Sequence, residues 1–197
     1  KVWRDISGRR IHLTQSTKDN MPVLDSENMG VYFDGGDYLE LDHEKPTSNT
    51  VIIVAKGYGA LYGDDSSYIA PMIGHVRVGT GEDTETPDEI HDSKIERNQR
   101  SIYILKDDVS ENEVEMKFGL RRLMKRKLSM SRKVKDTRLY VGKAGINVAN
   151  NFKGDIYEIL IYDRLLSETE IQEIHNDLAL RWDVEASKPT EVIVDIK

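Results

Sequence analysis

The sequence predicts an all-β fold that ends in one short α-helix, at about residues 167–182, and three observations support this prediction. Apolar and aromatic residues crowd together from Ile156 to Tyr162 around a single charge, which indicates a largely buried strand. The run from Thr50 to Ala55 is the purest β-branched stretch of the chain and is typical of a central strand. Residues 114–120 alternate between apolar and polar types, as a strand with one buried face does.

The helix prediction rests on the first turn of the helix and on its periodicity. Ser167 is a favourable N-cap residue and Glu170 follows it at capping-box spacing, so the two can satisfy backbone donors at a helix start. The apolar residues beyond this point recur at helical spacing, and they are Ile171, Ile174, Leu178 and Trp182. We therefore expect an amphipathic helix that lies against the sheet containing the preceding strand.

Residues 31–41 predict a hairpin near the N-terminus. Its two arms, V-Y-F and D-Y-L-E-L, flank a D-G-G turn at Asp34 to Gly36. Asp34 and Asp37 beside these glycines, together with Asp155, are candidate ligands for calcium, because hard cations prefer carboxylate oxygens. The alternative is that the aspartates accept hydrogen bonds from turn amides. Calcium is the one cofactor that the sequence suggests.

The segment from Gly57 to Tyr68 has the composition of a flexible loop that presents aromatic rings and carboxylates. Sugar-binding sites need this mixture, because an aromatic ring packs on the C–H face of a sugar while polar groups bond its hydroxyls. The candidate ligand-binding residues are Tyr58, Tyr62, Asp64, Asp65 and Tyr68, with Asn147 and Asn150 from a later loop. The alternatives are a hairpin whose tyrosines cover the core edge, and asparagines that serve only as turn residues.

Two charged stretches are candidate contact surfaces for other subunits or domains. Residues 82–96 are rich in acid, and residues 121–135 contain eight Lys or Arg and no acid. The basic stretch is either a solvated insertion or a docking site for the acidic one, within the chain or across a subunit boundary. Nucleic acid is not expected as a partner, because the basic stretch lacks aromatic residues and the chain carries a net charge of −7.

Composition bounds the remaining classes of protein. The 197 residues fit a single domain that can bury a sufficient core without disulfides or bound metal ions. Hydrophobic residues make up 38% of the chain, yet no apolar run is long enough to span a membrane, so membrane insertion is not expected. Cysteine is absent, which excludes disulfides, thiolate metal sites and cysteine nucleophiles.

Two separated patterns make the fold prediction more specific. The first is F-x-G-D-I-x-E-I-x-I-Y-D-R-x-L-S-x-x-E from Phe152, followed by a helix that ends in L-x-x-R-W. The second is W-R-D-I-S-G from Trp3, with V-Y-F-D-G-G-D-Y-L from Val31. Together they resemble the two ends of laminin-G-like domains in the concanavalin A-like lectin and glucanase superfamily. The resemblance implies a jelly-roll β-sandwich of two antiparallel sheets with the short C-terminal helix.

The resemblance places one jelly-roll domain at residues 1–183. Domains of this kind carry another strand before the W-x-D-x-S-G element, so we expect a first strand that the sequence, beginning at Lys1, does not include. After Trp182, a linker-like S-K-P-T leads into the strand-like E-V-I-V-D-I-K. Residues 184–197 are therefore interpreted as a linker and tail toward a further domain or partner, with residues 187–197 making the contact.

The fold leaves function open, because lectins, glycosidases, adhesion modules and virion proteins share it. Glycosidases of this fold use an E-x-D-x-x-E or E-x-D-x-E strand, which is absent here, so catalysis is not expected. The leading hypothesis is a non-catalytic recognition module that binds a glycan or another surface ligand within an extracellular, cell-surface or virion assembly. The alternative is a structural or decoration domain of a viral particle or surface layer, and a glycoside hydrolase comes third.

Overall fold

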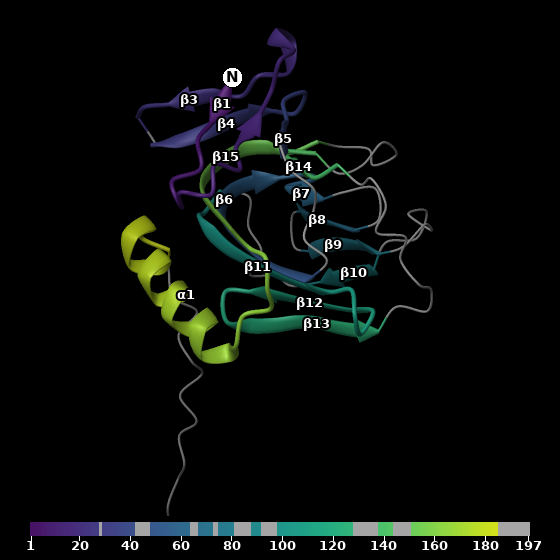
Figure 1. The fold of residues 1–197 in the computed structure, drawn as a ribbon. Coiled ribbons are helices and arrows are strands. Elements are labelled where there is room, and N and C mark those ends of the chain that lie inside the picture. The colour runs from purple at the N-terminus through teal and green to yellow at the C-terminus, as the bar shows by residue number, and fades with distance from the viewer. Residues whose placement is uncertain are drawn as a thin grey trace, which may run out of the picture.

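Two antiparallel sheets pack face to face in the computed structural model and enclose the main core (Figure 1). The structure describes residues 1–27, 29–41, 48–63, 67–72, 75–80, 88–91, 98–127, 138–143 and 151–184. Besides the sheets, this part of the chain contains a 3-10 helix, Lys18–Asn20, and one α-helix, α1, at Glu168–Trp182. None of its helices is long and apolar enough to cross a membrane. The predicted sandwich with one C-terminal helix is confirmed.

The strands divide into a sheet of eight and a sheet of seven. The eight-stranded sheet has the order β1-β2-β5-β14-β7-β8-β9-β10, which in residues is Val2–Trp3, Leu13–Thr14, Leu39–Leu41, Tyr140–Val141, Tyr62–Gly63, Ser67–Met72, His75–Thr80 and Asp88–His91. The seven-stranded sheet has the order β13-β12-β11-β6-β15-β4-β3, which in residues is Arg121–Lys127, Glu113–Phe118, Ser101–Asp108, Ser48–Tyr58, Lys153–Tyr162, Gly30–Asp34 and Val23–Asp25. Neighbouring strands within each sheet are antiparallel.

β6 lies at the centre of the seven-stranded sheet, between β11 and β15. Val51, Ile53 and Ala55 face the eight-stranded sheet and belong to the main core. Ile52 and Val54 face the opposite way and belong to a second core beneath α1. The β-branched run predicted as a central strand is therefore confirmed, and burial on both faces is why the run carries no charge.

α1 lies across the outer face of the seven-stranded sheet (Figure 1). The predicted capping box is present, because the Ser167 hydroxyl accepts from the Glu170 N–H while the Glu170 carboxylate accepts from the Ser167 N–H. Hydrogen bonds from Arg164 and from Ser167 lower the pKa of the Glu170 carboxyl to about 2. Ile171 and Leu178 are buried against the sheet, as the helical periodicity predicts.

Thr50 joins the start of this helix to the centre of the sheet. Its hydroxyl donates to the carbonyl of Arg164 at 3.1 Å and accepts from the N–H of Leu166 at 3.0 Å, and the residue is fully buried. Both backbone groups lie in the turn between β15 and α1, where neither element supplies a partner for them. One side chain of β6 therefore fixes the path by which the chain enters the helix.

Residues 31–41 do not form the predicted hairpin. β4 pairs with β3 and β15 in the seven-stranded sheet, whereas β5 pairs with β2 and β14 in the eight-stranded sheet. The D-G-G turn therefore carries the chain from one sheet to the other. The alternation of apolar and polar residues predicts two strands, but it does not show with which strands they pair. Both strands still contribute to the core between the sheets, where the side chains of Phe33 and Leu39 are buried.

The basic stretch begins as an edge strand and not as an insertion. Its first 7 residues form β13, which pairs with β12. Arg122 forms an ion pair with Glu115 at 2.7 Å, and Lys125 forms one with Glu113 at 2.8 Å. These two cations are thus neutralised by the neighbouring strand. The rest of both charged stretches, apart from β10, lies outside the described residues, so their mutual docking stays a prediction.

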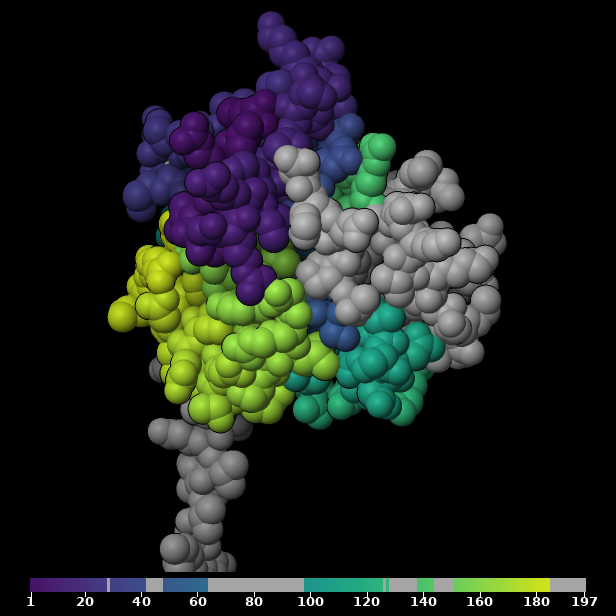
Figure 2. Space-filling model, in the orientation of Figure 1, coloured from purple at the N-terminus to yellow at the C-terminus, as the bar shows by residue number. Residues whose placement is uncertain are grey.

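The N-terminal and C-terminal segments of the sandwich meet on one face. Figure 2 shows the N-terminal segment, in purple, directly beside the strand and helix of the C-terminal part, in yellow and green. An ion pair between Arg9 and Asp163 joins them. The hydrogen bond from Arg9 lowers the pKa of the Asp163 carboxyl, so the contact favours the charged form of this acid.

Candidate functional site

The two sheets differ in what covers their outer faces. α1 packs on the outer face of the seven-stranded sheet. No helix of the described chain lies on the outer face of the eight-stranded sheet, where the outward positions of β2, β5 and β14 carry polar and aromatic residues and that of β1 carries a valine. We call this outer surface of β1, β2, β5 and β14 the open face.

One row of residues crosses the open face in register. In order across the sheet, the row consists of Val2, Thr14, Glu40, Tyr140 and Gly63. Side chains at opposed positions of neighbouring strands project to the same side of a sheet. The residues next to them along each strand belong to the main core, so this row faces outward. It places a carboxylate and a phenol side by side, next to a glycine.

Tyr38, just before β5, adds a second ring to this row. The rings of Tyr38 and Tyr140 have centres 5.8 Å apart and an angle of 80° between their planes, which is an edge-to-face pair. The Lys143 ammonium stands 4.3 Å from the centre of the Tyr38 ring and 4.6 Å from that of Tyr140, within cation–π range. Tyr140 is only 7% exposed, so Tyr38 is the ring of the pair that meets solvent.

The backbone of Tyr38 is held from both sides. Its N–H donates to the Asn20 carbonyl at 3.1 Å, and its own carbonyl accepts from Nε2 of Gln15 at 3.1 Å. Gln15 is itself buried, and its Oε1 accepts from the Thr17 N–H at 2.8 Å. The ring is therefore presented by a fixed backbone, which lowers the entropic cost of binding a ligand to it.

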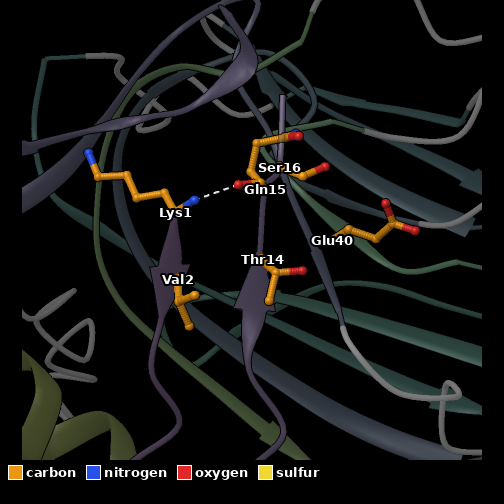
Figure 3. Close-up of a pocket in the computed structure, with 6 residues that line it drawn as sticks. All are labelled: Lys1, Val2, Thr14, Gln15, Ser16 and Glu40. Atoms are coloured by element: carbon orange, nitrogen blue, oxygen red, sulfur yellow. Dashed lines mark hydrogen bonds between the residues drawn. The ribbon is translucent and has the colours of Figure 1, made fainter. Parts of the chain in front are cut away.

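A pocket of about 360 Å³ lies next to the ring pair, at the side of the sheet formed by β1 and β2 (Figure 3). The residues that line it are Lys1, Val2, Thr14, Gln15, Ser16 and Glu40. It is an open depression and not an enclosed cavity. Glu40 connects the pocket to the tyrosine pair, because it lies opposite Tyr140, and it forms an ion pair with Arg138 at 3.2 Å.

The tyrosines predicted at residues 57–68 do not gather at one place. Tyr58 ends β6 in the seven-stranded sheet, opposite Lys153. Tyr62 begins β7 in the eight-stranded sheet, and it is 2% exposed and part of the main core. Tyr62 is therefore a core residue and does not present its ring to a ligand, because alternation along β7 turns Tyr62 inward and Gly63 outward.

The other predicted ligand-binding residues are placed in part or not at all. Tyr68 stands opposite Gly63 on β8, so its backbone position continues the row across the open face. Asp64, Asp65, Asn147 and Asn150 lie outside the described residues. Their contacts with a ligand stay predictions.

The three aspartates predicted to hold a cation do not converge. Asp37 accepts a hydrogen bond from the Asp34 N–H at 2.9 Å, and Asp34 accepts one from the Gly36 N–H at 2.7 Å, which is the turn-amide alternative. Asp155 lies on β15, opposite Tyr32. Over the described ranges, no group of three or more His, Cys, Asp or Glu side chains is placed to hold a metal ion.

Asp155 is a buried acid on the outer side of the seven-stranded sheet. It is 8% exposed, and its Oδ1 has no hydrogen-bond partner within the described structure. Burial raises the pKa of this carboxyl and the charge of Asp25 raises it further, while Lys56 and Arg100 act in the opposite direction. Of the three predicted ligands, Asp155 is the one whose buried negative charge a bound proton or cation would stabilise most.

We expect Asp155→Asn to stabilise the domain increasingly as the pH rises. The folded-state pKa of Asp155 lies above its ordinary value of 3.8. Wild-type stability therefore falls as the pH rises from 3.8 through the folded-state pKa, because the buried carboxyl has to ionise, whereas asparagine has no charge to bury. Urea unfolding in EDTA from about pH 3 to about pH 7 measures the difference. Asp163→Asn is the control, and its difference runs the opposite way because the pKa of Asp163 is lowered. A difference independent of pH for Asp155→Asn would contradict the prediction.

Sequence reasoning did not single out five residues on or beside the open face, which are Tyr38, Glu40, Arg138, Tyr140 and Lys143. One signal was available, because Tyr38 and Glu40 stand two positions apart in a predicted strand and therefore share a face. What the sequence does not show is the pairing of β5 with β14, which lie far apart along the chain. Without that pairing the two tyrosines have no evident relation.

Comparison with solved structures identifies the fold. The CBM40 of a Ruminococcus gnavus IT-sialidase aligns with a TM-score of 0.54 and 15% identity, over 67% of this chain and 84% of that one. A Trypanosoma rangeli sialidase aligns with a TM-score of 0.69 and 13% identity, over 93% of this chain and 32% of that one. The fold is a concanavalin A-like jelly roll. Domain 4 of AbnA, a GH43 extracellular arabinanase from Geobacillus stearothermophilus, matches this jelly roll with a TM-score of 0.54 and 13% identity, over 74% of this chain and 76% of that one.

Sequence comparison adds no closer relationship. No family model matches the chain, and no curated protein does. At the identities given above, the structural matches show the jelly-roll fold alone. The function of this jelly roll therefore has to be argued from the residues on its surface.

Proposed function

We propose that this jelly roll is a non-catalytic glycan-binding module whose ligand lies on the open face, beside Tyr38. The observation that carries the proposal is the edge-to-face pair of Tyr38 and Tyr140, next to a pocket and to the ion pair of Glu40 with Arg138. A partly exposed ring on a fixed backbone, with a carboxylate and a guanidinium nearby, suits sugar recognition, because the ring offers an apolar surface and the charged groups offer hydrogen bonds.

Each group of the open face has its own role in this proposal. The Tyr38 ring packs on the C–H face of one sugar unit. The Glu40 carboxylate accepts hydrogen bonds from sugar hydroxyls, while the Lys143 ammonium and the Arg138 guanidinium donate to sugar oxygens. The pocket beside Thr14 receives a neighbouring sugar unit. None of these steps breaks a bond, so the proposal requires no catalytic pair of carboxylates.

We propose most of the residues predicted from the sequence as further contacts for the same ligand. Tyr68 occupies the next position of the row beyond Gly63 and is proposed as a further contact. Four more proposed contacts follow Gly63 or Lys143 closely in sequence, and they are Asp64, Asp65, Asn147 and Asn150. Tyr58 belongs to the other sheet and is not part of the proposed surface.

The structural comparisons support a carbohydrate ligand. The Ruminococcus gnavus CBM40 has been solved bound to alpha2,3 sialyllactose and to alpha2,6 sialyllactose, and domain 4 of AbnA in complex with arabinotriose. These sugars are therefore the first probes for this jelly roll. An extracellular location is supported by the extracellular arabinanase, whereas a place in a cell-surface or virion assembly and a bound calcium ion stay predictions.

We expect Tyr38→Ala to weaken glycan binding by at least about tenfold, because the ring supplies the main apolar contact with the sugar. A glycan array that includes sialyllactose and arabinotriose identifies the ligand, and isothermal titration calorimetry then gives the Kd of both proteins. The array is run in EDTA and again in calcium, so that a requirement for the predicted cation is detected.

Tyr32→Ala is the matched control for this substitution. Tyr32 is a tyrosine with partial exposure as well, but it lies on β4 of the seven-stranded sheet. Its loss is expected to leave the Kd unchanged. Equal weakening in both variants would contradict the proposed site, and an array without a hit above background in either buffer would contradict the proposed function.

A further inference from the structure

We propose that the glycan bound on the open face contains a negatively charged sugar unit, whose carboxylate or sulfate group binds the Lys143 ammonium. The inference rests on the proposed function and deepens it, because it names the class of sugar. The observation behind it is the charge balance around the tyrosine pair, where one lysine lies beside the Tyr38 ring and contacts no carboxylate of the described chain.

The charged side chains around the tyrosine pair do not balance. Glu40 forms an ion pair with Arg138 at 3.2 Å, so these two charges neutralise each other. Lys143 is the cation that remains. Within the described residues its ammonium contacts the Tyr38 and Tyr140 rings and forms no ion pair with an acid. The surface beside the partly exposed Tyr38 ring therefore carries a positive charge without a counter-ion from the described chain.

The other charged groups near this surface are held by contacts of their own. Asp37 alternates with Tyr38 and turns inward, where its buried carboxylate accepts the Asp34 N–H. Asp34 in turn accepts from an amide of the turn between the sheets. The Lys1 ammonium group Nζ donates to a backbone carbonyl, and Figure 3 shows that this side chain extends away from Glu40. These contacts leave the charge beside the Tyr38 ring unpaired.

The backbone before Lys143 fixes where its side chain begins. Gly142 follows β14 with a φ of 85°, and its N–H donates to the Leu61 carbonyl at 2.9 Å. The Gly142 carbonyl accepts from the Phe152 N–H, also at 2.9 Å. An added Cβ at Gly142 would stand 2.5 Å from the Phe33 ring, so the chain passes close against the core here. Because this point of the chain is fixed, binding a ligand group to the lysine costs less entropy.

The contact with the rings leaves the ammonium available to a ligand. A cation–π contact at a partly exposed site is weak compared with a hydrogen bond between an ammonium and an anionic oxygen. A neutral sugar offers the ammonium only hydroxyl oxygens, whereas a carboxylate or a sulfate also neutralises its charge. An acidic sugar unit that packs on Tyr38 therefore gains a contact at Lys143 that its neutral counterpart lacks.

The charge of the whole chain makes such a preference informative. The net charge is −7, so the protein surface does not attract anions in general. Tighter binding of acidic than of neutral sugars therefore requires a local cation at the site. Because the contact is electrostatic and partly exposed to solvent, it weakens as the ionic strength rises.

Matched glycans test the proposal on the full chain by isothermal titration calorimetry in EDTA. The acidic probes are sialyllactose, sulfated lactose and trigalacturonic acid, and their neutral counterparts are lactose and galactotriose. We expect at least one acidic probe to bind about fivefold more tightly than its neutral counterpart at about 50 mM salt. This ratio is expected to fall toward one at about 500 mM salt.

Substitutions show whether the preference arises at Lys143. Lys143→Gln is expected to weaken binding of the preferred acidic probe about fivefold and binding of its neutral counterpart by less than about twofold. Lys143→Arg keeps the charge and is expected to retain the preference. Lys153→Gln is the matched control, because Lys153 is an exposed lysine on β15 of the other sheet, and it is expected to leave both Kd values unchanged.

The outcomes separate this inference from the proposed function. If lactose, galactotriose or arabinotriose binds as tightly as every acidic probe, the inference is wrong and the glycan-binding module stands. A preference for acidic probes that survives in Lys143→Gln would also overturn the inference, because the cation responsible would lie elsewhere. Absence of binding to every probe and to every glycan of the array would contradict the proposed function, and this inference with it.

Discussion

We expect Gly154→Ala to lower the free energy of unfolding by at least about 3 kcal/mol, from backbone strain and overpacking together. Gly154 lies on β15 directly opposite Gly57 of β6, at the centre of the seven-stranded sheet. Its φ is 145°, a conformation that side chains rarely adopt, and an added Cβ would stand 2.6 Å from Cα of Gly57 and collide with the Lys56 carbonyl. The colliding atoms are backbone, so they move only if the two strands separate.

Gly8→Ala separates the two contributions to this effect. Gly8 also has a positive φ, of 89°, but an added Cβ there meets nothing within 4 Å. Its substitution is expected to cost about 1 kcal/mol, from the conformational term alone. Urea unfolding followed by circular dichroism measures both variants. A Gly154→Ala protein as stable as Gly8→Ala would show that the close approach of β6 and β15 is not tight.

Thr50→Val is the second substitution with a large expected effect, a loss of roughly 2–4 kcal/mol in the free energy of unfolding. Valine matches threonine in shape and in strand preference, so packing is kept. The loss arises because the buried N–H of Leu166 and the carbonyl of Arg164 are left without their hydrogen-bond partner. The fluorescence of Trp182, at the end of the helix that this turn introduces, can report the unfolding transition together with circular dichroism.

Thr50→Ser is the control for this substitution. Serine keeps the hydroxyl and loses one methyl group, so it is expected to cost only about 1 kcal/mol. Thr50→Val should therefore be the less stable of the two, although it is the better match in volume. The reverse order would mean that the hydroxyl contributes less than the methyl group, and that the turn is held by other contacts.

Elements with a strong local pattern were predicted well from the sequence. The central run of β6 and the helix with its capping box carry their own evidence, because burial on both faces and helical periodicity are properties of neighbouring residues. The two ends of the chain carried the jelly-roll resemblance, and the structure confirms this fold. The partner of a strand is a property of distant residues, which is why β4 and β5 were wrongly predicted to pair.

The candidate site was less predictable than the fold, for a physical reason. The composition of residues 57–68 suggested a flexible loop. Gly57 instead allows β6 and β15 to approach closely, and Tyr62 packs in the core. Composition shows which groups are available but not which way they face. Tyr38 and Tyr140 form a pair only because β5 and β14 are neighbours in the sheet.

The position of β6 between β11 and β15 bears on how the chain acquires its structure during synthesis. The middle strand of the sheet pairs on one side with residues that emerge from the ribosome only near the end of the domain. Contacts between such distant segments form slowly, because a long loop must close before they contribute any stability. Until residue 162 has been made, the edge of β6 that pairs with β15 stays open, and α1, which covers the outer apolar face of β6 and β11, follows later still. An open edge and an uncovered apolar face favour association of the nascent domain with other chains.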